Sequence, residues 1–221
     1  MKRCGMRYFD LMVVAFAFVA TSMVGSAAAA TVGTVRHVAV GAYGTPPEAE
    51  RETLFRDGDI YADELVETVA KGALHLRFRD GTELRLGESS EATLDRYVYN
   101  ASTGDGDFAV DLTQGAFLFI TGALTSDSYS LATPVGVIGV RGTILYITIS
   151  TLGIVTVTVL DGAATMALVA GKSVDVANGE TVAFGRDGSV TENAVAPRDA
   201  GVGEVRGMPG HGRGNRHDHI D

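Results

Sequence analysis

The chain has 221 residues, a length that suits one domain with additional segments at its ends. Its formal net charge of −9 at pH 7 makes the surface repel nucleic-acid phosphates and anionic lipid headgroups, so we expect no nucleic-acid partner. The single cysteine, Cys4, lies near the N-terminus, and the later residues therefore have no thiol nucleophile, disulfide or cysteine metal ligand.

Residues 1–30 have the features of a secretory signal peptide. Three basic residues precede a short apolar run at 11–24, and four alanines at 27–30 offer a cleavage site. The apolar run is shorter than the roughly 20 residues that a membrane-spanning helix needs, and no later segment qualifies as a span. Cleavage removes three positive charges and one negative charge, which takes the net charge from −9 to −11. We expect an exported protein, periplasmic or secreted, of a Gram-negative bacterium, with no membrane span after signal cleavage.

From residue 31 onward, short apolar runs alternate with turn residues, and helical periodicity is almost absent. Strands are expected near residues 32–40, 65–69, 74–78, 82–86, 92–99, 108–112, 116–120, 129–133, 144–149, 154–160, 164–169, 173–176 and 181–184. This spacing predicts an all-β fold, an antiparallel sandwich or β-roll of about ten or more short strands.

The clearest local element is a hairpin over residues 74–86. A two-residue loop would place Phe78 opposite Glu83 and mix the apolar and charged faces. A three-residue loop at 79–81, with its glycine in a left-handed conformation, places Phe78 opposite Thr82 and keeps the charged side chains together. We therefore predict the three-residue loop, with one buried face and one charged face.

Residues 132–143 contain glycines at every third position among β-branched residues. Pro134 cannot donate to a sheet ladder, and Gly136, Gly139 and Gly142 permit a positive φ or a close backbone approach. We therefore expect bends here, and a corner of the β-core. The spacing does not match a G-x-G-x-x-G loop between a strand and a helix, so a phosphate-binding loop is disfavoured.

Arg141 is the one charged residue of that stretch. A guanidinium in an apolar run is costly unless it is paired, so we expect bonds to backbone carbonyls or an ion pair with Asp95, Asp111 or Asp161. Contact with a carboxylate of a partner is the functional alternative. On the structural interpretation, Gly139→Val or Arg141→Ala lowers stability before it affects binding.

Candidate catalytic residues are few. His37 and His75 are the histidines in the body of the chain, and neither belongs to a recognisable Ser-His-Asp arrangement. Asp105 and Asp107 could form an acid–base pair or bind calcium, but acidic surface loops are common. We therefore predict no catalytic site and no enzyme.

The C-terminal segment, residues 193–221, is rich in glycine, arginine and histidine. His217 and His219 flank Asp218, and with His211 they could bind a divalent metal such as nickel, copper or zinc. A disordered, solvated tail is the simpler interpretation. We predict no metal site and no cofactor.

Four blocks, residues 74–86, 94–99, 115–117 and 133–143, together resemble the FecR domain family. The resemblance is best over 57–148, inside a β-domain that we place at 31–192. The motif residues that carry it are Asp80, Gly81, Thr133, Pro134, Gly136, Gly139, Arg141, Gly142 and Thr143.

This resemblance implies a regulatory role and supplies no catalytic residues. In the family member that gives its name, the domain is the periplasmic part of a transmembrane regulator that relays receptor occupancy to a sigma factor. This chain has no evident cytoplasmic domain, following membrane span or receptor-docking domain, so we expect the stand-alone secreted type without the anti-sigma and transmembrane segments.

Two functions fit these features. The leading hypothesis is a non-enzymatic protein-interaction or signal-sensing module that presents strand edges or loops to an unknown envelope protein. The alternative is a glycan- or small-ligand-binding module with Tyr97, Tyr99 and Tyr129 as aromatic surfaces. Aromatic residues at strand positions more often belong to the core.

Overall fold

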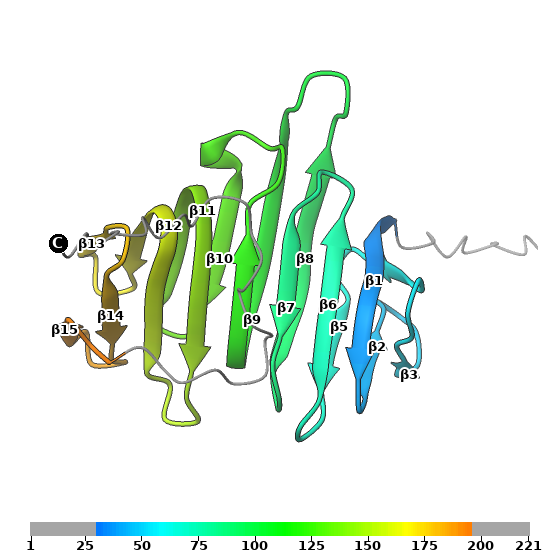
Figure 1. Cartoon of the computed structure of the whole chain (residues 1–221), viewed down its shortest axis with the longest axis horizontal. Helices are drawn as coiled ribbons and strands as arrows, with labels where there is room; N and C mark the ends of the chain where they lie inside the picture. The colour runs from blue at the N-terminus through cyan, green and yellow to red at the C-terminus, as the bar shows by residue number, and fades with distance from the viewer. Residues whose placement is uncertain (1–29, 196–221) are drawn as a thin grey trace, which may run out of the picture.

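The computed structural model describes residues 30–195, whose regular secondary structure is strand apart from one 3-10 turn, and the predicted all-β class is confirmed (Figure 1). The strands are β1 (Thr31–Ala39), β2 (Ala42–Thr45), β3 (Glu52–Thr53), β4 (Asp59–Tyr61), β5 (Leu65–Thr68), β6 (Ala73–Phe78), β7 (Glu83–Leu86), β8 (Glu91–Tyr99), β9 (Gly106–Ile120), β10 (Tyr129–Thr133), β11 (Gly136–Ile149), β12 (Val155–Leu168), β13 (Ser173–Val176), β14 (Thr181–Phe184) and β15 (Val190–Glu192), with a 3-10 turn η1 (Ser126–Ser128). The segments 1–29 and 196–221, which hold the expected signal peptide and tail histidines, lie outside the described residues.

All of these strands belong to one hydrogen-bonded sheet that folds over into two layers. The first layer has the order β4-β1-β6-β7-β9-β11-β12-β14-β15. The second has the order β3-β2-β5-β8-β9-β10-β11-β12-β13 (Figure 1). The three long strands β9, β11 and β12 therefore take part in both layers. The β9–β10 pair is parallel, so the sheet is not entirely antiparallel.

Left-handed glycines lie where these three strands pass from one layer to the other. Gly115 of β9, Gly142 of β11 and Gly162 of β12 have φ values of 109°, 56° and 84°. Such values are costly for residues with a Cβ, so glycine allows the strands to bend without interruption. The corner predicted within residues 132–143 is confirmed at Gly142.

Gly136 and Gly139 do not bend the chain, contrary to the expectation. Both lie in regular antiparallel pairing with β12. Gly136 is needed for another reason, because a Cβ there would collide with the carbonyl oxygen of Ala167. Gly139 has room, since the nearest atom to such a Cβ is the carbonyl oxygen of Thr165 at 4.0 Å. The expected loss of stability in Gly139→Val therefore has no basis in the structure.

The β6–β7 hairpin has the predicted three-residue loop. The Phe78 amide donates to the Thr82 carbonyl over 2.9 Å, and Gly81 has a φ of 87°. Arg77 lies opposite Glu83, and their side chains form an ion pair at 3.3 Å. The alternation of apolar and charged residues therefore determined the register correctly.

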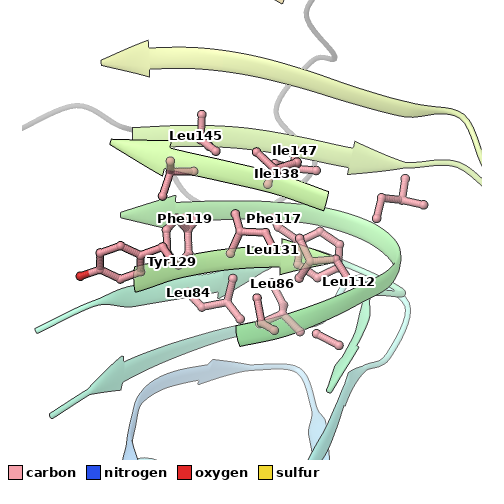
Figure 2. Packing of buried hydrophobic residues seen from close by; sticks show 14 of the residues in the cluster. Leu84, Leu86, Leu112, Phe117, Phe119, Tyr129, Leu131, Ile138, Leu145 and Ile147 are labelled. Carbon is pink, nitrogen blue, oxygen red and sulfur yellow. The ribbon is translucent and has the colours of Figure 1, made fainter. Parts of the chain in front are cut away.

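The hydrophobic core lies between the two layers. Figure 2 shows its side chains between the ribbons, with Phe117 and Leu145 from the first layer and Leu131 and Ile138 from the second. Aromatic rings also connect the layers, because Phe108 of the second layer packs edge-on against Phe78 of the first, with centroids 4.8 Å apart. Burial of these side chains is the main favourable contribution to folding.

Glu64, between β4 and β5, is a carboxylic acid buried without a full set of partners. Its side chain is 0% exposed, and Oε2 accepts a hydrogen bond from the Tyr61 amide at 2.7 Å. Its Oε1 atom has no hydrogen-bond partner among residues 30–195. Burial raises the pKa of Glu64 to about 7, although the Tyr61 hydrogen bond acts in the opposite direction.

Gly142→Ala and Gly139→Ala form a matched pair that tests the bend. We expect Gly142→Ala to lower the free energy of unfolding by about 1–2 kcal/mol, because alanine resists a left-handed φ. Gly139→Ala lies in an ordinary strand with free space, so its effect should be smaller than about 0.5 kcal/mol. Urea denaturation measures both values. Equal effects of the two substitutions would contradict the assigned bend.

The raised pKa of Glu64 predicts a pH dependence of stability. Between its ordinary value of 4.5 and about 7, the folded state binds more protons than the unfolded state, so stability falls as pH rises through this window. The loss should be of the order of 3 kcal/mol at pH 8. Glu64→Gln stays neutral and should be more stable than the parent at pH 8, with a flatter dependence. Urea denaturation from pH 5 to pH 8 measures this, and identical pH profiles would refute it.

Candidate functional site

Asp80, the first motif residue, belongs to a buried structural network, and Gly81 follows it in the β6–β7 loop with a φ of 87°. The Asp80 carboxylate accepts hydrogen bonds from Thr82 Oγ1 at 2.5 Å and from the Tyr129 hydroxyl at 3.0 Å. The Asp80 amide donates to the Tyr97 hydroxyl at 2.7 Å. Burial raises the pKa of both tyrosines, so their hydroxyls remain protonated donors. Tyr129 is buried and Tyr97 is half-buried against the core, so neither offers an open aromatic platform for a glycan.

The other side chains considered for chemistry are spread over the molecule. Tyr99 packs against the core, and both aspartates are exposed, Asp105 in the β8–β9 loop and Asp107 at the start of β9. His37 and His75 lie opposite each other on β1 and β6. Within residues 30–195, no group of three or more His, Cys, Asp or Glu side chains could hold a metal ion.

Thr133, Pro134 and Gly136 form the hairpin turn between β10 and β11. Thr133 pairs with Gly136 across the turn, and Thr133 Oγ1 donates to the Gly136 carbonyl at 2.7 Å. Pro134 occupies the turn itself, where its missing N–H costs no ladder hydrogen bond. These residues set the start of β11 and so the faces on which its later side chains emerge.

Thr143 secures the bend beside Gly142. Its hydroxyl accepts from the Arg141 amide at 2.9 Å and donates to the Ala163 carbonyl of β12 at 2.8 Å. Its own amide donates to Thr121 Oγ1 at 2.9 Å. Because the Thr143 side chain is buried, water could not replace these hydrogen bonds if the hydroxyl were removed.

Arg141 points into solvent, and the pairing expected with Asp95, Asp111 or Asp161 is wrong. The alternation along β11 directs Val140 into the core and Arg141 to the outer face, where its side chain is 77% exposed. Its guanidinium lies 3.8 Å from the carboxylate of Asp127, which is 90% exposed. A pair this long and this exposed contributes little to stability.

A groove of about 670 Å³ surrounds Arg141 on the outer face of the second layer. Its outward-facing lining residues are Asp127, Gly139, Arg141, Ala163, Thr165 and Asp175. The floor of the groove lies close to the backbone because Gly139 has no side chain and Ala163 has only a methyl group. Thr165 Oγ1 donates to the Asp175 carboxylate at 2.8 Å, which fixes one wall. The groove thus presents a guanidinium together with two carboxylates.

Asp127, Thr165 and Asp175 also line the groove, although no pattern in the sequence indicates this. Asp127 lies in η1, Thr165 in β12 and Asp175 in β13, so only the strand pairing brings them to Arg141. Along β11, successive side chains point alternately into the core and out to solvent. This alternation is the sequence signal that places Arg141 outside the core.

Thr143→Val and Thr165→Val separate the bend from the groove wall. Thr143→Val leaves the Arg141 amide and the Ala163 carbonyl without their partner in a partly buried position, so we expect a loss of about 1–3 kcal/mol of stability. Thr165 is exposed, and Thr165→Val should cost less than about 0.5 kcal/mol. Chemical denaturation compares them, and a stable Thr143→Val variant would show that the bend does not depend on these hydrogen bonds.

Comparisons with known proteins give one family and two solved structures. Residues 64–165, from the residue before β5 into the second half of β12, match the family model described as FecR protein. Two crystal structures of a candidate anti-sigma factor from Parabacteroides distasonis ATCC 8503, at 1.65 and 2.50 Å resolution, are similar at 13% and 12% sequence identity. Each has a TM-score of 0.47, and each match covers 58% of this chain and 58% of that chain.

The chain therefore spans less than two thirds of the length of those structures. No curated protein matches it. Among residues 30–195, no helix has the length and apolar character needed to cross a membrane. The family match includes both the β6–β7 hairpin and the bend at Gly142. Residues 64–165 match the FecR family model, which confirms over this range the family resemblance found in the sequence.

Proposed function

We propose that this protein is a non-enzymatic protein-interaction and signal-sensing module of the cell envelope, and that a partner protein docks in the groove around Arg141. The observation that carries the proposal is the exposed guanidinium in a groove with a small-residue floor. The exposed and loosely paired Arg141 contributes little to stability. Its presence in the family motif is therefore better explained by binding to a partner than by a role in folding.

The groove chemistry indicates what a partner should present. A guanidinium binds carboxylates with two parallel hydrogen bonds, and it does so best when water is excluded. Asp127 and Asp175 flank it and can accept bonds from amides or basic side chains. The low floor at Gly139 and Ala163 allows an extended backbone to approach closely. We therefore propose an extended segment with one acidic side chain beside polar or basic residues.

The sheet edges are less suitable for docking than we expected from the sequence. The terminal strands of the two layers, β3, β4, β13 and β15, have two, three, four and three residues. An added strand would gain few backbone hydrogen bonds on edges this short. The face of the second layer is thus the better surface for a partner.

The proposed setting is the periplasm or the exterior of a Gram-negative bacterium. Its support is the basic and apolar pattern of residues 1–30 and the acidic charge of the remaining chain. In this setting, the partner would be an envelope protein whose state the module senses by binding.

Affinity capture with three baits tests the role of Arg141. Parent protein, Arg141→Ala and Arg96→Ala are each incubated with envelope extract, and bound proteins are quantified by mass spectrometry. Arg96 is the control because it is an exposed arginine outside the groove. We expect Arg141→Ala to reduce recovery of a specific partner about 10-fold or more, because a charged hydrogen bond is lost.

The melting temperatures of the three proteins should agree. Equal recovery with all three baits would contradict docking through Arg141. A lower melting temperature of Arg141→Ala alone would show a structural role for the guanidinium instead.

A further inference from the structure

Asp175 of β13 is an exposed carboxylate that is held in place without a cation. Thr165 Oγ1 donates to it at 2.8 Å. In the part of the chain that the structure describes, no basic group lies within ion-pair distance of this carboxylate. Asp127, by contrast, already lies 3.8 Å from the Arg141 guanidinium. Asp175 is therefore the groove carboxylate whose charge is available to a basic group of a partner.

A hollow of about 190 Å³ adjoins Asp175 between the strands that end the two layers, β13 and β15. Its carboxylates are those of Asp175, Glu180 and Glu192. The Ala177 amide donates to Glu180 Oε2 at 2.9 Å and so orients that side chain. No three acidic or histidine side chains of the described residues are arranged to hold a metal ion. The hollow is better suited to the long side chain of a lysine or an arginine.

The strand pairing fixes the separation between Arg141 and Asp175. Gly139, Thr165 and Asp175 lie opposite one another in one row across β11, β12 and β13. Arg141 lies two residues farther along β11 than Gly139. Two strand spacings and two residue steps therefore separate the backbone positions of Arg141 and Asp175, which amounts to about 12 Å. Ala163 and Thr165 of β12 lie between them.

An extended partner segment matches this separation at one spacing. Side chains two residues apart on a strand share a face but lie only about 7 Å apart, and side chains three residues apart face opposite sides. Side chains four residues apart share a face and lie about 13 Å apart. The residue midway between them would lie over Ala163 and Thr165, where the methyl group of Ala163 leaves room for the partner backbone.

We propose that the partner is recognised by two opposite charges four residues apart in an extended segment that crosses β12 diagonally. This inference rests on the docking role proposed above for the groove. An acidic side chain of the segment binds Arg141, and a basic side chain binds Asp175 at the hollow. Thr165 is a positioning residue, because it holds the Asp175 carboxylate. A segment with only negative charges is disfavoured, since Asp175, Glu180 and Glu192 repel it.

Peptide titrations followed by two-dimensional NMR of the ¹⁵N-labelled protein test the spacing. Three peptides of serine and threonine have the same composition and carry one glutamate and one lysine, placed two, four or six positions apart. We expect the four-position peptide to bind about 5-fold more tightly than the other two, the effect of one additional exposed charge pair. Arg141→Ala should weaken the binding of all three peptides.

Variants of the groove assign the basic end of the peptide to Asp175. Asp111→Asn is the matched control for Asp175→Asn, because Asp111 is an exposed aspartate of the second layer outside the groove. Asp175→Asn should abolish the preference for four positions, and Asp111→Asn should preserve it. Thr165→Val should reduce the preference at an unchanged melting temperature. Asp175→Lys should prefer a peptide with two glutamates four positions apart.

The outcomes separate this inference from the docking role on which it rests. A preference for four positions that survives Asp175→Asn would overturn the assignment of Asp175. Binding that depends on Arg141 but not on the spacing would overturn recognition by two charges and leave docking in the groove intact. Binding that Arg141→Ala does not change, or no binding of any peptide at millimolar concentration, would overturn both. Thermal melting verifies that each variant is folded.

Discussion

The structure depends on three strands that each bend at a left-handed glycine and so serve two layers at once. Because β9, β11 and β12 contribute backbone hydrogen bonds to both layers, neither layer has a complete ladder without the other. At β11, the Thr143 hydroxyl joins the bend to β12. Such sharing of strands favours a single cooperative folding unit over two independently stable sheets.

The same bend determines the candidate site. Gly142 and Thr143 fix the path of the backbone directly after Arg141, so the guanidinium emerges on the outer face of the second layer. Arg141 itself contributes little to that geometry, because it is exposed and only loosely paired with Asp127. Neighbouring motif residues therefore have different roles. Gly142 and Thr143 shape the bend, whereas Arg141 is exposed and available to bind a partner.

The sequence correctly predicted features that depend on the alternation of apolar and polar residues along one strand. It did not predict features that depend on how strands distant in the sequence pair with one another. The β6–β7 register followed from which residues could share a face, and it is confirmed. Gly139 and Gly142 have the same composition around them, but only pairing with β12 shows that Gly142 bends and Gly139 does not. The apolar neighbours of Arg141 suggest a buried setting in the sequence, but successive side chains on a strand face opposite sides, and Arg141 is exposed. Its groove partners come from other elements and have no local signal.

Photo-crosslinking in intact cells tests most directly whether the groove around Arg141 receives a partner. A photoreactive residue fits at position 139, where a Cβ would have no atom closer than 4.0 Å, and position 96 serves as an exposed control outside the groove. We predict a crosslinked product from position 139 that disappears with Arg141→Ala, and no such product from position 96. A product from position 96 in the absence of one from position 139 would contradict docking in this groove.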